Sequence, residues 1–173
     1  MAESVSIDAV LLPPGPSPYF VQTKLSKDHP CFSKEVATAP LLKMLDLPIV
    51  VYRSHPPEPE DYNDASRPDL DCQVATYLNI NPSTGCAPEE WQSHVGECMI
   101  ARKDGKSLSV EQVEVVYDYV CTILDRFGDR EGPPQDLYSR TSFEEYFQEY
   151  RRGKMEESGD IEAWKLVGSL YDA

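Results

Sequence analysis

The side chains best suited to acid–base chemistry lie between positions 69 and 97 of the sequence. His94 stands three residues before Glu97, and an imidazole beside a carboxylate can act as a general base near neutral pH. Asp69 and Asp71 are two residues apart, so on an extended segment their carboxylates share one face. We therefore predict that a catalytic site, if the protein has one, uses His94 with Glu97, Asp69 and Asp71.

Aromatic residues near this group could form the apolar wall that a ligand pocket needs. Trp91 precedes His94 by three residues, and Tyr77 lies in an apolar stretch upstream. We take Trp91 and Tyr77 as candidate ligand-binding residues. The competing interpretation is a hydrogen-bonded, partly buried His94 with no chemical role, because catalysis needs further partners within reach.

The common catalytic and nucleotide-binding motifs do not occur in the chain. The sequence contains no G-x-S-x-G, no G-x-x-x-x-G-K-[ST] and no G-x-G-x-x-G. Neighbouring His and Cys residues, such as His94 with Cys98, match no known nucleophile loop, and Cys98 lies within a predicted strand where a packed thiol is expected. The sequence predicts no cofactor, and it leaves open whether the protein is an enzyme.

Acidic residues are densest in residues 58–71, which we interpret as a solvated loop. A calcium loop does not fit, because Ser66 stands where glycine is needed and Cys72 where a bidentate Glu is needed. A magnesium site at Asp69 and Asp71 stays open as an alternative. The five cysteines include no C-x-x-C pair, so a structural zinc site is not expected either. We assign no metal ligands.

Charge and hydropathy exclude several classes of partner. The 173 residues contain 16 Lys and Arg against 30 Asp and Glu, a formal net charge of −14, which opposes binding to nucleic acid or to an anionic membrane. No apolar run approaches the ~18–20 residues that span a bilayer. The N-terminus lacks the features of a signal peptide, and the odd number of cysteines favours reduced thiols. We therefore expect a cytoplasmic protein.

Hydrophobic periodicity and turn residues predict the elements that would position these groups. We expect strands at 47–53, 74–80 and 95–102, then an Asp104-Gly105 turn and a short return strand at 106–108. We expect helices at 41–45, 110–127 and 161–167, and one that begins with a capping box at Thr141 and ends at Gly153. A capping box at Ser109 and Gln112 starts the long helix. Its inner face should bury Val120 and Leu124, and Glu114 should lie on the opposite face.

The last strong helix has an aromatic stripe of Phe143, Tyr146, Phe147 and Tyr150. This spacing favours core packing, and a face presented to a partner is the alternative.

The element order favours an α+β fold over a doubly wound parallel one, because the strands follow one another without a helix between each pair. We predict a small, mainly antiparallel sheet packed by C-terminal helices. Residues 1–38, with the run Pro13-Pro14-Gly15-Pro16-Ser17-Pro18, should form an extended, irregular arm laid over the core. Residues 39–173 should form a single α+β domain.

Because the reactive residues are few and match no motif, we expect a small intracellular binding or interaction module with an acidic surface. Its partner would be an unknown protein or a small-molecule ligand, and the oligomeric state is left open. Two alternatives remain. One is a small-molecule enzyme that uses His94 with the nearby carboxylates, and the other is an acidic inhibitor or mimic of a negatively charged ligand. Convergence of His94 with its proposed partners would favour the enzyme.

Overall fold

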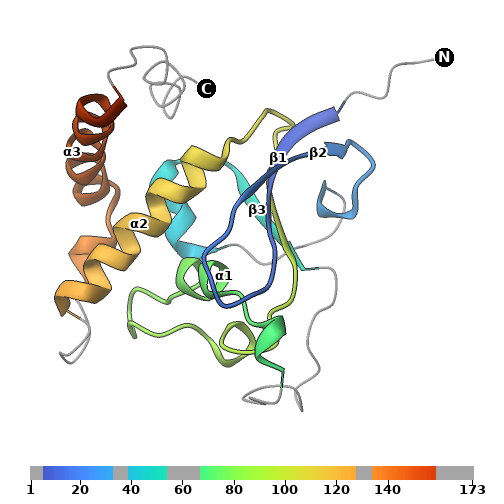
Figure 1. Ribbon diagram of the computed structural model, residues 1–173, viewed down its shortest axis with the longest axis horizontal. Coiled ribbons are helices and arrows are strands. Elements are labelled where there is room, and N and C mark those ends of the chain that lie inside the picture. Colours follow the sequence, from blue (N-terminus) through green and yellow to red (C-terminus); the bar gives the residue numbers. More distant parts are fainter. Residues whose placement is uncertain (1–5, 33–38, 54–66, 128–133, 159–173) are drawn as a thin grey trace.

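A four-stranded antiparallel sheet forms the centre of the molecule (Figure 1). The computed structural model describes residues 6–32, 39–53, 67–127 and 134–158. The strands are β1 (Ser6–Leu12), β2 (Val21–Ser26), β3 (Ile49–Arg53) and β4 (Cys98–Arg102), in the spatial order β2-β1-β4-β3. The α+β fold predicted from the sequence is confirmed.

The N-terminal segment is a hairpin of the sheet, where the sequence analysis expected an irregular arm. β1 lies inside the sheet, paired with β2 on one side and with β4 on the other. The side chains of Val10 and Leu12 are fully buried in the main core, and Ala9 is fully buried on the opposite face. A strand that is covered on both faces shows an apolar run without clear alternation, so the two-residue pattern that predicts a strand is absent from β1.

Helix α2 (Val110–Phe127) supplies much of the core on one face of the sheet, and α3 (Arg140–Ser158) packs on α2 farther from the sheet (Figure 1). The fully buried side chains of this core include those of Val120, Phe143 and Phe147. The sequence analysis correctly placed Val120 inward. It expected Leu124 to be buried and Glu114 to lie on the opposite face, but both side chains are half-buried.

Both long helices begin at a serine cap. The Ser109 N–H donates to Gln112 Oε1 (2.9 Å) and the Gln112 N–H donates to Ser109 Oγ (3.3 Å), as the capping box predicts. In α3 the cap is Ser139, whose Oγ accepts from the Ser142 N–H at 3.2 Å, and not Thr141.

Helix α3 also continues through Gly153, where the sequence analysis ended it. A glycine within a helix costs only about 1 kcal/mol relative to alanine, so it does not by itself stop a helix.

Residues 73–78 form helix α1 (Gln73–Leu78), which corrects the strand predicted over 74–80. Val74, Ala75 and Leu78 are buried together on one side of this helix. The same residues satisfy a two-residue alternation almost as well, because short apolar runs do not distinguish a helix from a strand. The strands expected at 47–53 and 95–102 correspond to β3 and β4.

The turn after β4 does not lead to the expected return strand at 106–108. Gly105 adopts φ +73°, and the chain then runs to α2 with the Leu108 N–H donating to the Asp8 carbonyl at 2.9 Å. The remaining described elements are short 3-10 helices: η1 (Pro30–Phe32), η2 (Pro40–Leu45), η4 (Pro68–Leu70), η5 (Glu89–Trp91) and η6 (Gln135–Tyr138). The helix expected at 161–167 and most of the acidic segment 58–71 lie outside the described residues.

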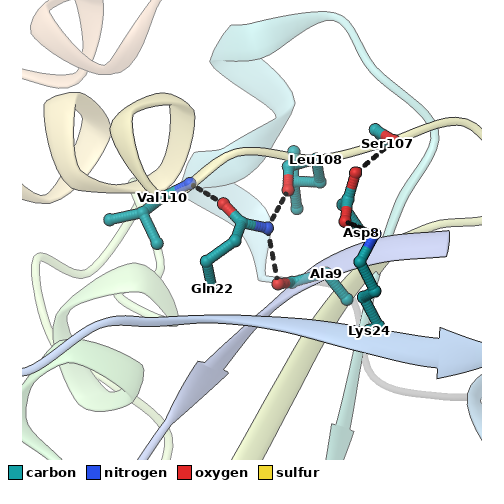
Figure 2. Close-up of polar contacts among 7 residues, drawn as sticks. All are labelled: Asp8, Ala9, Gln22, Lys24, Ser107, Leu108 and Val110. Atoms are coloured by element: carbon teal, nitrogen blue, oxygen red, sulfur yellow. Dashed lines mark hydrogen bonds and ion pairs between the residues drawn. The ribbon is translucent and has the colours of Figure 1, made fainter.

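A glutamine from β2 ties the N-terminal hairpin to the start of α2 (Figure 2). Gln22 Nε2 donates to the carbonyls of Ala9 and Leu108, both at 2.9 Å, and Gln22 Oε1 accepts from the Val110 N–H at 3.0 Å. Beside it, Asp8 accepts hydrogen bonds from Lys24 and Ser107. The hairpin and the helix are therefore fixed relative to each other by polar contacts as well as by the core.

Candidate functional site

His94 lies in the loop between η5 and β4, and its backbone is held from both sides. It adopts a left-handed φ of 49°, which is uncommon for a residue other than glycine. Its N–H donates to Asp71 Oδ1 at 3.1 Å, and its carbonyl accepts from Arg53 Nη2 at 3.0 Å. The structure therefore brings Asp71 and His94 together, but through the backbone of His94 and not through its imidazole.

Arg53, at the end of β3, organises this loop and was not among the residues singled out from the sequence. Besides His94, its guanidinium donates to the carbonyls of Val95 (Nε, 3.0 Å) and Glu90 (Nη1, 2.5 Å). It also lies over the ring of Trp91, with its central carbon 4.7 Å from the ring centroid. Trp91 is buried, so its ring serves as a platform for Arg53.

The Nε2 nitrogen of the His94 imidazole is buried and makes no hydrogen bond within the part of the chain that the structure describes. Asp69 is exposed and pairs with Arg67 through two hydrogen bonds of 2.8 and 2.9 Å. The bonds from Arg67 are the main reason that the pKa of Asp69 lies below its usual value, and the charge of His94 contributes in the same direction.

Glu97 and Tyr77 do not join His94 by any hydrogen bond among the described residues. The Glu97 side chain is exposed just before β4. Tyr77 lies on α1, and its ring stacks on that of Tyr117 with the centroids 5.8 Å apart. Helix α1 instead reaches Trp91 through Thr76, whose hydroxyl donates to the Trp91 carbonyl. The assignment of His94, Glu97, Asp69 and Asp71 as catalytic residues, and of Trp91 and Tyr77 as ligand-binding residues, stays a prediction.

The cysteines near this loop are buried free thiols. Burial raises the pKa of Cys98 to about 12, and it also raises the pKa of Cys72. On the other face of the sheet, burial raises the pKa of Cys31 to about 11. A thiol with so high a pKa is protonated at neutral pH and is a poor nucleophile. Within the described ranges, no three His, Cys, Asp or Glu side chains are grouped so that they could hold a metal ion.

The hydrogen bonds around His94 hold the loop before β4 in one conformation. Three carbonyls, one from η5 and two from the loop after it, converge on one guanidinium, and one N–H of that loop donates to a carboxylate. This arrangement fixes the left-handed His94 and the loop around it. The only sequence signal for Arg53 is a charged residue that ends an apolar strand, and that signal does not reveal its partners.

Comparison with known proteins adds no assignment: no family model, no curated protein and no solved structure matches this chain. The described helices include none that is both long enough and apolar enough to cross a membrane.

Proposed function

We propose that the protein is a non-catalytic interaction module with an acidic surface. The observation that carries this proposal is that the polar side chains around His94 form hydrogen bonds with the backbone of its loop. Arg53 and Asp71 bind the backbone of the loop that contains His94, so they do not form a set of side chains directed at one reacting atom. The high pKa of Cys98 points in the same direction, because a protonated, buried thiol has no role in nucleophilic catalysis.

One observation favours the alternative of a small-molecule enzyme. Nε2 of His94 is buried and makes no hydrogen bond among the described residues, and an unpaired buried nitrogen is a place where a substrate group could bind. On this alternative, Asp69 and Glu97 supply nearby negative charge. The third function considered from the sequence, an acidic inhibitor or mimic, rests on the net charge of −14 alone.

A replacement experiment in the source cells separates the module from the enzyme. The gene is replaced by one that encodes the His94→Gln variant, and the proteins that co-purify with the affinity-tagged chain are quantified after cross-linking. Glutamine can form hydrogen bonds but cannot act as an acid or base at neutral pH. Glu89→Gln, an exposed change in η5 at a residue outside the candidate site, is the control and should replace the wild type whichever function holds.

If the protein is an interaction module, the His94→Gln chain should replace the wild type and retain the same cross-linked partners. A variant that folds normally and keeps its partners but fails to replace the wild type would contradict the module. That result would favour acid–base chemistry at His94, where a positioned group contributes about 10²–10⁴-fold to a rate.

A further inference from the structure

Strand β2 forms one edge of the described sheet, and the outer side of this strand has no partner among the described strands (Figure 1). Each residue of Val21–Ser26 pairs with β1, in a continuous register without a bulge. The side chains of Gln22, Lys24 and Ser26 are exposed. An edge strand presents a row of unpaired N–H and C=O groups, so β2 can pair with one further strand.

Strand β2 lacks the features that usually keep an edge strand from pairing with another chain. Natural edges carry prolines, bulges or charged side chains. The segment Val21–Ser26 contains no proline and one charge, Lys24, whose ammonium lies 2.9 Å from Asp8 Oδ1 of β1. The opposite edge differs, because Pro48 precedes β3 and none of the five residues of β3 is exposed. Of the two edges, β2 is therefore the one suited to pairing.

The distribution of charge around β2 permits contact between two copies of the chain. The chain contains 30 Asp and Glu residues and has a net charge of −14, so two copies repel each other at most orientations. No residue from Ala9 to Lys27 is acidic. Two copies that meet along β2 therefore bring together segments that lack the repelling side chains.

The residues of β2 favour one register for such a pair. When two identical strands pair antiparallel about a two-fold axis, the residue at the axis faces itself. The overlap is longest with the axis at Thr23 or at Lys24. An axis at Lys24 places two ammonium groups opposite each other, which is unfavourable. An axis at Thr23 places Val21 opposite Leu25 of the second copy and Gln22 opposite Lys24 of the second copy, so no like charges meet.

The register about Thr23 also gives a contact to an exposed aromatic side chain. Tyr19 has 63% of its surface exposed and is the one large hydrophobic side chain that is exposed among the described residues. Its neighbour Phe20 packs edge-on against Tyr117 of α2, with ring centroids 5.7 Å apart. Because the strands are antiparallel, the start of one β2 lies beside the end of the other, and Tyr19 comes close to Lys27 of the second copy. An ammonium beside an aromatic ring is a favourable contact.

We propose that the outer edge of β2 is a self-association surface, along which two copies of the chain pair antiparallel about Thr23 and join their sheets. Main-chain hydrogen bonds supply the affinity, as they do wherever a strand adds to the edge of a sheet. The Gln22 side chain already fixes β2 to β1 and to the start of α2 (Figure 2), so the pairing costs little conformational entropy. This inference is independent of the proposed function, because it concerns contacts of the chain with itself.

Sedimentation equilibrium of the full-length chain tests the association, at protein concentrations up to about 1 mM. We expect a monomer–dimer equilibrium that strengthens with added salt, because salt screens the repulsion between two chains of charge −14. Thr23→Lys places two ammonium groups at the axis and should weaken the dimer about tenfold or more. Thr84→Lys, the same change at an exposed loop position outside the sheet, should not weaken it.

Disulfide formation tests the register. In a chain whose exposed Cys86 is replaced by serine, Thr23→Cys should form a reducible dimer with oxidised glutathione, because residues that face each other across two strands are close enough for a disulfide. Ser26→Cys should not, because the axis places residue 26 opposite residue 20 of the second copy. Far-UV circular dichroism checks that all variants are folded.

Three results would each overturn the proposal. The first is a wild-type chain that stays monomeric at every protein and salt concentration. The second is a dimer that a folded Thr23→Lys variant leaves intact. The third is a disulfide that forms through Ser26→Cys and not through Thr23→Cys. None of these results bears on the proposed function, which is tested by the partners of the His94→Gln chain in cells.

Discussion

Arg53 lies over the indole of Trp91, 38 residues farther along the chain, while its guanidinium donates to the backbone carbonyls of Glu90, His94 and Val95 on either side of Trp91. A buried aromatic platform below and carbonyls at the rim hold the planar guanidinium in one orientation. The planar fork of arginine is needed for this, because a lysine ammonium cannot reach several carbonyls in a fixed plane while stacking on a ring.

We therefore expect Arg53→Lys and Arg53→Ala to destabilise the fold. Hydrogen bonds from a charged group are each worth about 1.5–3 kcal/mol and are not additive, so a loss of about 2–4 kcal/mol is expected for Arg53→Ala. Urea unfolding at pH 7 measures it. Lys103→Ala, an exposed change near the end of β4, should stay within about 0.5 kcal/mol. Equal midpoints for the Arg53 and Lys103 variants would contradict a role for Arg53 in holding the loop.

The contacts of Gln22 can be tested by Gln22→Glu, which replaces the donor nitrogen of the side chain by an oxygen of nearly the same size. In Gln22→Glu, one carboxylate oxygen can still accept from the Val110 N–H, but the other faces the carbonyls of Ala9 and Leu108 without a proton to donate. Two part-buried acceptors lose their donor, and water can reach the exposed Gln22 position, so the free energy of unfolding at pH 7 should fall by about 1 kcal/mol.

Acid should restore part of the stability of the Gln22→Glu variant. The protonated carboxyl group can donate to one of the two carbonyls, so its pKa should be higher in the folded than in the unfolded chain. The variant therefore gains stability relative to wild type as the pH falls through that pKa. Urea midpoints at pH 7.5 and pH 5 test this. A difference between variant and wild type that is independent of pH would mean that the Gln22 contacts are not those in Figure 2.

Local signals in the sequence predicted the parts of this fold that depend on local contacts. The Ser109–Gln112 box and the apolar stripe after it define α2 within one stretch of chain. The pairing of β1 with β4 joins residues some 90 positions apart, and no local pattern encodes it. The helix α1 was missed because its apolar residues also alternate, and only the tertiary environment of Val74 and Leu78 distinguishes the two periods.

The candidate site shows the same limit. The sequence places His94 near carboxylates, but it does not show that Asp71 would bind the backbone N–H of His94. It does not show that Arg53 would bind the carbonyls of residues 37, 41 and 42 positions away. The left-handed φ of His94 has no sequence signal either, since glycine or asparagine usually marks such a position.

The pH dependence of stability should reflect two carboxylates of α2, Glu114 and Asp118. Burial is the main cause that raises the pKa of both Glu114 and Asp118, and Lys154 of α3 opposes it. The folded chain therefore binds these protons more tightly than the unfolded chain. Their contribution to stability is fully present below the unfolded pKa values and is lost as the pH rises from there through the folded pKa values.

We expect Asp118→Asn to raise the urea midpoint at pH 8 relative to wild type, with the difference shrinking as the pH falls towards 4. Glu149→Gln removes an exposed carboxylate on α3 and should show no such trend. Lys154→Met should lower the midpoint at pH 8, because it removes the positive charge that favours ionised Glu114 and Asp118. A midpoint for Asp118→Asn below that of wild type at pH 8 would mean that the ionised carboxylate is stabilised by its surroundings.

Substitutions on the two helices should separate full burial from partial burial. Phe147 is fully buried in the main core, so Phe147→Ala should lower the free energy of unfolding by about 3–5 kcal/mol through lost contacts and a residual cavity. Leu124 is only half-buried, and Leu124→Ala should cost less than the ~2–5 kcal/mol expected when a leucine is fully buried. Urea unfolding gives both values. If Leu124→Ala proves as damaging as Phe147→Ala, then α2 is rotated relative to the structure, with Leu124 and not its neighbours directed into the core.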